Sequence, residues 1–352
     1  MSSRKPSWGY IAKESILKIT TFVTYQEEPT MTLPMAGASQ AATNPFSQLI
    51  IDCDNDSNKI QARYNAHRSN RNALFREKLL AKDFSGWQVD EILRNLILAQ
   101  ETAKTNAHST PNENGNGIQA PFVDHRHNLN FYVRPPKHIR EIVTEIQAEL
   151  RDVAPTLWFS PPESLHITVL EVASSRTAEE VDALAAHLHE KTGAASKLVN
   201  YTNSPHHRAR LVKPMLSYDA SAMALSFLPA VDEPTNHSSL SDAYSYHHLR
   251  RDLAHQVLET GITLGARYVV PSAHVTLARC VSQDGSDAKY VMRLVERIEK
   301  VNGMLKEKYW PADGLMPLRG EWVIGEKEGL EMNKGTSWYG GGDKILVGEG
   351  FE

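Results

Sequence analysis

The sequence has few of the residues that cross-link or anchor a protein. Only two of its 352 residues are cysteines, which excludes a disulfide scaffold and a cysteine-ligated zinc site. No stretch approaches the roughly 20 apolar residues that span a bilayer. The net charge of -4 excludes the strongly basic surface of a protein that coats nucleic acid by electrostatics alone. We therefore expect a globular protein of a reducing compartment, the cytoplasm or alternatively the nucleus, without a membrane partner.

Composition divides the chain into three parts. Residues 1–45 end in a run of small and polar residues, for which we expect a flexible N-terminal tail. Residues 46–118 hold two stretches of helical spacing, 58–82 and 85–104, which predict a helical extension that ends in an Asn- and Gly-rich linker. Residues 119–352 alternate between strand and helix patterns and predict an α+β domain.

Within this domain a pattern of strand, helix and strand occurs twice. The first copy is expected at 129–133, 137–152 and 165–172, with a short strand at 157–159 between its helix and its last strand and a helix at 177–191 after it. The second copy is expected as strands at 210–218, 223–227, 267–270 and 274–280, with a helix at 246–260. After it we expect a helix at 288–308 and short strands near 322–324 and 344–347. This repeated order indicates two related lobes.

Each copy carries the same short motif in its last strand. The two segments are SLHITV at 164–169 and SAHVTL at 272–277. Because residues i and i+2 point to the same side of a strand, His166 with Thr168, and His274 with Thr276, would each present an imidazole and a hydroxyl on one face. Two such strands facing each other would surround one small volume with two histidines and two hydroxyl donors.

This set of side chains suits the cleavage of a phosphoester. One neutral imidazole removes a proton from the attacking hydroxyl or water, and the other, protonated, delivers a proton to the departing oxygen. Only histidine has an unperturbed pKa near neutrality, so the two can hold opposite protonation states. The hydroxyls of Thr168 and Thr276 can donate to the phosphate oxygens, where charge grows in the transition state. The motifs alone do not decide whether His166 or His274 is the base.

A bare His-x-Thr is common, and His108 in the linker supplies a control. It also precedes a threonine by two residues, but no strand pattern surrounds it, and we assign it no function. The copies at His166 and His274 share more: a serine two residues before the histidine, apolar flanking positions and a nearby proline. Their duplication in matched contexts favours a functional interpretation.

The pair resembles the two-histidine (2H) phosphoesterase superfamily. The stretch Tyr268–Arg279 is close to the second motif of that family, and Phe131–Pro136 is similar to its opening strand. The whole chain, including Asn65–Arg68 and Gly86–Leu93, further resembles a group of fungal proteins named as an RNA ligase/cyclic nucleotide phosphodiesterase family. The resemblance implies a bilobal fold of two antiparallel sheets with pseudo-twofold symmetry, and cleavage of 2′,3′-cyclic phosphates without metal. The N-terminal helices and a polar insert at 229–244 are not part of the minimal family fold.

Four further residues are candidates for substrate binding. Arg279 and Lys213 could reach a phosphate, and Tyr132 and Trp158 could stack a base. Each has a plainer interpretation as a surface charge or a core aromatic residue, and Arg279 would lie on the opposite strand face from His274 if that strand stays regular. None of the histidine clusters has the spacing of a zinc site, so we expect no metal and no cofactor.

We therefore predict a monomeric, metal-independent phosphodiesterase that hydrolyses 2′,3′-cyclic phosphates of nucleotides or RNA ends. Two alternatives stay open at this point. The same four side chains would serve an enzyme that processes linear bonds at RNA ends, by 2′-5′ ligation or exonucleolytic trimming. A module that binds RNA or nucleotides without turnover is the other, although binding alone does not need paired proton carriers.

Overall fold

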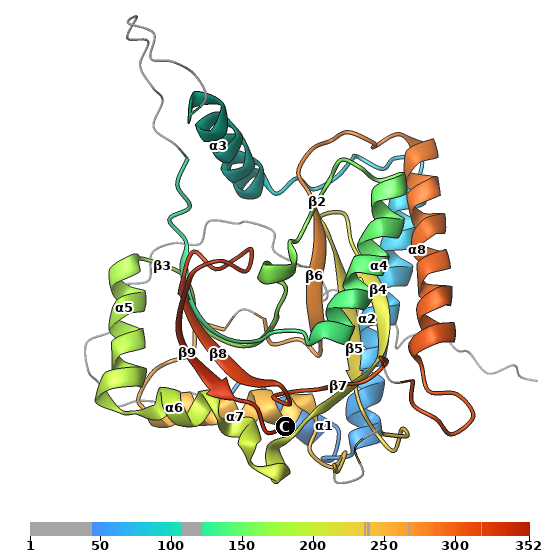
Figure 1. Cartoon of the computed structure of the whole chain (residues 1–352). Helices are drawn as coiled ribbons and strands as arrows, with labels where there is room; N and C mark the ends of the chain where they lie inside the picture. Colours follow the sequence, from blue (N-terminus) through green and yellow to red (C-terminus); the bar gives the residue numbers. More distant parts are fainter. Residues whose placement is uncertain (1–43, 108–121, 236, 238–239, 267, 318) are drawn as a thin grey trace, which may run out of the picture. The chain divides into compact units, whose positions relative to one another are not determined.

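A computed structural model describes residues 44–107, 122–235, 237, 240–266, 268–317 and 319–352 (Figure 1). Residues 42–352 form one compact unit, and a second unit, residues 1–41, lies outside the described residues. The linker with His108 also lies outside them, so the predicted division at 45 and 118 stays a prediction. No helix within the described ranges is both long and apolar enough to cross a membrane.

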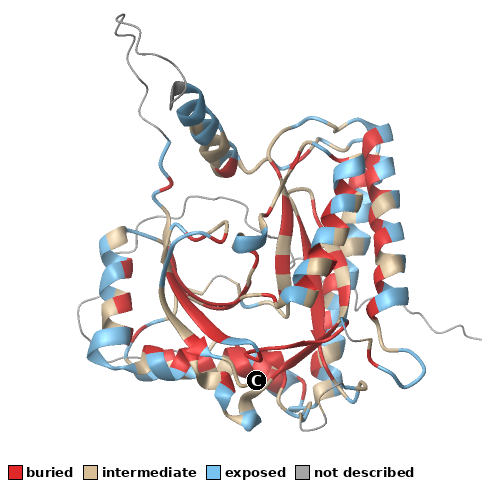
Figure 2. Cartoon of the chain, viewed as in Figure 1, coloured by how far each residue is buried: buried red, intermediate tan, exposed pale blue. Residues whose placement is uncertain are grey.

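Two antiparallel sheets form the core, which confirms the predicted α+β architecture. The first sheet has the order β3-β1-β8-β9, with β1 at His127–Val133, β3 at Ile167–Arg176, β8 at Glu328–Gly335 and β9 at Asp343–Glu349. The second has the order β2-β6-β5-β4-β7, with β2 at Leu157–Phe159, β4 at Arg210–Tyr218, β5 at Ala222–Pro229, β6 at Ala273–Cys280 and β7 at Trp322–Val323. The central strands of both sheets are largely buried, whereas the edge strand β9 is mostly exposed or half-buried (Figure 2).

Helices cover both sheets. Their bounds are Ser47–Asp52 for α1, Ser57–Leu80 for α2, Glu91–Ala107 for α3, Lys137–Val153 for α4, Ala178–Ala186 for α5, Ala194–Val199 for α6, Tyr246–Glu259 for α7 and Ala288–Tyr309 for α8. In the second sheet α4 packs on β6, α8 packs on β4, and α2 packs on β4 and β5. In the first sheet α5 packs on β1 and β8, α6 on β8 and β9, and α7 on β3.

Local sequence explains most of these elements. The stripe of apolar residues predicted for α4 is buried along its whole length, as helical spacing requires: Ile139, Ile142, Val143, Ile146 and Leu150. Carboxylates cap two other helices, because the Asp56 side chain accepts from two backbone amides at the start of α2, and Asp287 does the same for α8. Burial of these stripes and satisfied helix ends fix where the helices begin and how they face the sheets.

Two predicted elements were wrong. The helix expected from residue 85 begins only at Glu91, because Gly86 has a φ of +102° and the next backbone amides bond elsewhere. The Gln88 amide bonds to the turn between β4 and β5, and the Asp90 amide to the end of β6. The strand expected at 267–270 is not formed by its described residues 268–270. The buried side chain of Arg250 donates to the backbone carbonyls of Tyr268 and Val270, which a strand would use for pairing.

Strand β8 was missed by the sequence analysis. Its residues Leu330 and Met332 are buried, but so are Glu331 and Asn333 on the other face. Polar residues at buried positions hide the apolar alternation by which a strand is recognised. Arg134, which pairs with Glu331 at 2.6 Å, compensates the buried carboxylate.

Candidate active site

The two histidine motifs lie on strands from different sheets that contact each other. His166 directly precedes β3, and His274 is the second residue of β6. In both motifs burial alternates, since the histidine and threonine are partly exposed while the intervening residue is buried. The strand period therefore turns the imidazole and the hydroxyl of each motif to the same side.

The two imidazoles lie close enough to interact electrostatically. Burial lowers the pKa of His274 to about 3, and the positive charge of a protonated His166 is the next largest contribution to that shift. Burial likewise lowers the pKa of His166 to about 4. Both residues are only partly buried, and two protonated rings this close would repel each other.

Backbone and ring contacts orient His166. Its Nδ1 lies 2.8 Å from the carbonyl oxygen of Ser164, which can only accept a hydrogen bond, so Nδ1 carries the proton. The neutral ring then has its lone pair on Nε2. The ring of Tyr132 lies against the imidazole, with the centroids 4.0 Å apart. A base at this position has both its tautomer and its ring plane defined.

A different set of groups holds His274. Its Nδ1 lies 3.2 Å from the hydroxyl of Tyr268 and 3.2 Å from that of Ser272. Burial raises the pKa of Tyr268 to about 12, so the phenol keeps its proton at neutral pH and can donate to Nδ1. Because a hydroxyl both donates and accepts, these groups can hold the neutral ring and can also accept from Nδ1–H of the protonated ring. The serines that precede the two histidines in sequence thus act differently, Ser164 through its carbonyl and Ser272 through its hydroxyl.

Arg279 lies on the same strand face as His274, against the expectation for a regular strand. The pairing of β5 with β6 shifts register between Ala224, opposite Thr276, and Met223, opposite Ala278. This bulge inserts one residue, so Leu277 and Ala278 are both buried and Arg279 is returned to the partly exposed face. Its positive charge contributes to the lowered pKa of both His166 and His274, which places the guanidinium near the pair.

Two aromatic residues, Trp158 and Tyr339, lie next to Arg279. Trp158 of β2 is the cross-strand partner of Arg279. The ring of Tyr339, in the turn between β8 and β9, lies 6.2 Å from the Trp158 ring and 5.4 Å from the Arg279 guanidinium carbon. Asp90 binds both Arg279, at 3.2 Å, and the Tyr339 hydroxyl, at 2.7 Å. Tyr339 and Asp90 were not found from the sequence, because no local pattern links them to the histidines.

Two candidate substrate contacts are not placed as proposed from the sequence. Tyr132 is 1 % exposed and its ring faces His166, so it packs against the imidazole and offers no open face for a base. Lys213 lies on β4, which β5 separates from β6, and its ammonium group binds Glu233 at 2.6 Å. The ion pair accounts for this lysine, and the structure does not bring it to the histidine pair.

Helix α2 brings a third histidine toward His274. Arg68 of this helix donates to the carbonyl of Ser226, the cross-strand partner of His274. The preceding residue, His67, contributes to the lowered pKa of His274, and its buried Nε2 has no hydrogen-bond partner among the described residues. The spacing of buried residues in α2 gave no sign that it approaches the histidine motifs.

Comparisons with known proteins find similar folds only among solved structures. No model of a known protein family and no curated protein matches the chain. A conserved protein of unknown function from Agrobacterium tumefaciens is 12% identical to this chain, with a TM-score of 0.40. The match covers 69% of this chain and 95% of that protein. Usb1 from Kluyveromyces marxianus, solved with uridine monophosphate, is 12% identical, with a TM-score of 0.33. The match covers 63% of this chain and 96% of the Usb1 chain.

In this structure each antiparallel sheet supplies one His-x-Thr segment to a shared site. Contacts between β3 and β6 bring together His166 and His274, which lie more than a hundred positions apart in the sequence. Helices α1, α2 and α3 come before β1 in the chain, outside the two-lobed core that is formed by the two sheets and helices α4–α8.

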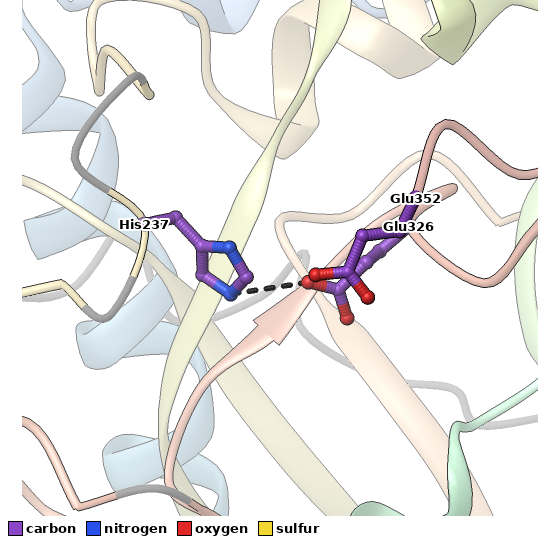
Figure 3. A group of neighbouring side chains, drawn as sticks. All are labelled: His237, Glu326 and Glu352. Carbon is purple, nitrogen blue, oxygen red and sulfur yellow. Dashed lines mark ion pairs between the residues drawn. The ribbon is translucent and has the colours of Figure 1, made fainter.

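One group of side chains away from the two histidines has the residue types of a metal site. His237, Glu326 and Glu352 each offer a ligand atom, and these atoms lie within 4.8 Å of one another (Figure 3). Nε2 of His237 is 3.1 Å from Glu326, and Lys327 pairs with Glu352. The carboxylates of Glu326 and Glu352 thus already have partners within the protein. The group lies beside β7, at the opposite side of the second sheet from β6, and we assign it no part in the chemistry of the histidines.

Proposed function

We propose that this protein is a metal-independent phosphodiesterase that hydrolyses 2′,3′-cyclic phosphates of nucleotides or RNA ends. The observation that carries the proposal is the pair of imidazoles with opposite Nδ1 partners. A carbonyl accepts from Nδ1 of His166, whereas hydroxyls surround Nδ1 of His274. His166 therefore offers a lone pair at Nε2, and the hydroxyls beside His274 can accept from its Nδ1–H when that ring is protonated, so the pair can supply the base and the acid that cleavage needs.

In the proposed reaction His166 is the base and His274 the acid. Nε2 of His166 removes a proton from a water molecule as its oxygen forms a bond to phosphorus. The bond from phosphorus to one ribose oxygen breaks, and protonated His274 delivers its Nε2 proton to that oxygen. The negative charge of the bound phosphate favours the protonated form of His274, opposing the burial that lowers its pKa in the free protein.

Three further side chains would stabilise the transition state. The hydroxyls of Thr168 and Thr276 share the strand faces of the histidines and can donate to the non-bridging phosphate oxygens. Arg279 adds a positive charge near both imidazoles. Such donors act where negative charge grows during the attack on phosphorus.

The test is turnover of 2′,3′-cyclic nucleotides by the purified full chain in the presence of EDTA. We expect His166→Ala and His274→Ala each to lower kcat about 10²–10⁴-fold, which is the usual contribution of a general acid or base. His108→Ala, in the third His-x-Thr of the sequence, is the matched control and should leave the rate unchanged. Unchanged rates in the His166 and His274 variants would overturn the proposal, and cleavage of linear RNA without cyclic-phosphate hydrolysis would favour RNA-end processing instead.

A further inference from the structure

The short segment between α2 and α3 is attached to the end of the strand that carries His274. Its Asp90 backbone amide donates to the carbonyl of Cys280, the last residue of β6, at 2.8 Å. The Gln88 amide donates to the carbonyl of Ala220, in the turn between β4 and β5, at 2.9 Å. These bonds fix an extended segment from outside the two-lobed core against the second sheet, next to Arg279.

The carboxylate of Asp90 connects three groups. One oxygen, Oδ2, accepts from Nη1 of Arg279 at 3.2 Å. The other, Oδ1, accepts from the Tyr339 hydroxyl at 2.7 Å and from the Leu93 backbone amide at 3.1 Å. The side chains of Asp90 and Arg279 are only 18% and 22% exposed, so solvent screens this ion pair less than a surface pair. Asp90 is therefore held by α3 and Tyr339 while it holds the guanidinium.

Both Asp90 and Tyr339 thus hold the side chain of Arg279. Its guanidinium carbon lies 5.4 Å from the ring centre of Tyr339, a distance at which an arginine and an aromatic face attract. A guanidinium carries five N–H donors, so a bond from Nη1 to Asp90 leaves donors for a second anion. An arginine that is already ordered loses less conformational entropy when it binds a phosphate than one that is mobile.

We propose that Asp90 is a positioning residue that holds Arg279 toward the histidine pair, so that the N-terminal extension completes the phosphate-binding site of the two-lobed core. The inference rests on the proposed phosphodiesterase function and adds a specific role for a segment outside that core. Asp90 acts through Arg279 and does not itself contact the phosphate. The effect of removing Asp90 should therefore depend on the presence of Arg279.

A double-mutant cycle tests this dependence. The full chain is compared with Asp90→Ala, Arg279→Ala and the double variant, using KM for a 2′,3′-cyclic nucleotide and the inhibition constant of the nucleoside 2′-phosphate product. We expect Arg279→Ala and Asp90→Ala each to raise KM and the inhibition constant about tenfold. The two constants of the double variant should be no higher than those of Arg279→Ala alone. The pH profile of kcat should keep its shape, because the histidines are intact.

Two further variants separate positioning from stability. Asp90→Asn keeps an oxygen for Leu93 and Tyr339 but loses the charge, so it should fold as the wild type does and still weaken phosphate binding. Glu91→Gln is the matched control, because the neighbouring Glu91 pairs only with Arg94 at the surface among the described residues, at 3.0 Å. It should leave KM and the inhibition constant unchanged.

The outcomes distinguish the two proposals. If the wild type hydrolyses the cyclic nucleotide but the Asp90 variants keep its KM, the positioning role is overturned and the phosphodiesterase function stands. Additive losses in the double variant would also overturn it, since they would show that Asp90 does not act through Arg279. A wild type that neither hydrolyses the cyclic nucleotide nor binds the 2′-phosphate overturns both.

Discussion

The ring of Tyr132 lies against the imidazole of His166, with the two planes at 31° and the centroids 4.0 Å apart. The phenol is fixed in turn, because its hydroxyl donates to the Ser337 carbonyl at 3.1 Å and accepts from the Asn130 side chain at 3.0 Å. The turn between β8 and β9 thereby holds the Tyr132 ring against His166, which directly precedes β3. Two strands and one turn together define the plane of the proposed base.

This contact predicts different effects for two substitutions of Tyr132. Tyr132→Phe keeps the ring and should lower the free energy of unfolding by about 1–3 kcal/mol, since the hydroxyl's hydrogen bonds are lost, while kcat stays within a few fold. Tyr132→Ala removes the ring, and we expect a loss of about 3–5 kcal/mol together with a clear fall in kcat. Urea unfolding and steady-state rates measure both. Equal kcat values in the two variants would contradict a role for the ring in orienting His166.

The lowered histidine pKa values predict an acidic optimum for kcat/KM. Burial lowers the pKa of His274 to about 3 and that of His166 to about 4, so both rings are neutral at pH 7 in the free protein. Since His274 must be protonated to act as the acid, kcat/KM should rise up to about tenfold per unit as the pH falls from 8 toward 5. A rate that rises with pH over this range would show that the acid has been assigned wrongly.

Buried neutral histidines also predict that acid destabilises the protein. Burial lowers the pKa to about 3 or 4 in five of them: His67, His166, His247, His248 and His274. In the unfolded chain a histidine titrates near about 6.5, so below this pH the unfolded state takes up protons that the folded state excludes. Their contribution to stability is complete above about pH 6.5 and is lost as the pH falls toward 4.

Urea unfolding at several pH values between 8 and 4.5 measures this loss as a falling midpoint. His248→Gln should flatten the dependence, because it removes one of the buried titrating groups, whatever its effect on stability at pH 8. His189→Asn is the control, since His189 is exposed. An equal flattening in both variants would exclude the buried histidine as the cause.

Gly340 predicts a link between the turn and the active site. A Cβ added here would lie 2.1 Å from the carbonyl oxygen of Ser164, the group that accepts from His166. Gly340→Ala should therefore displace this carbonyl and lower kcat in addition to stability. Gly314→Ala is the matched control, because its φ of +75° is close to the +83° of Gly340 but nothing lies within 4 Å of the added atom. If both variants keep the wild-type kcat, the Ser164 carbonyl does not control His166.

Local periodicity predicted much of the fold. Apolar spacing gave the helices α2, α4, α7 and α8 with ends close to those observed, because each buries a stripe that recurs at the helical period. The same reasoning placed both His-x-Thr segments on strands. It failed for β8, where the buried Glu331 pairs with Arg134 and Lys344. It also failed at 268–270, where Arg250 binds the carbonyls of Tyr268 and Val270.

The sequence by itself determined the paired motifs, His166 with Thr168 and His274 with Thr276, because strand alternation is a property of neighbouring residues. Only the tertiary structure decided what surrounds them. The bulge that turns Arg279 toward the histidines arises from pairing with β5, and Asp90 binds Arg279 across 189 residues of sequence. Contacts between segments so far apart leave no period in the sequence, since they depend on how complete strands and helices pack.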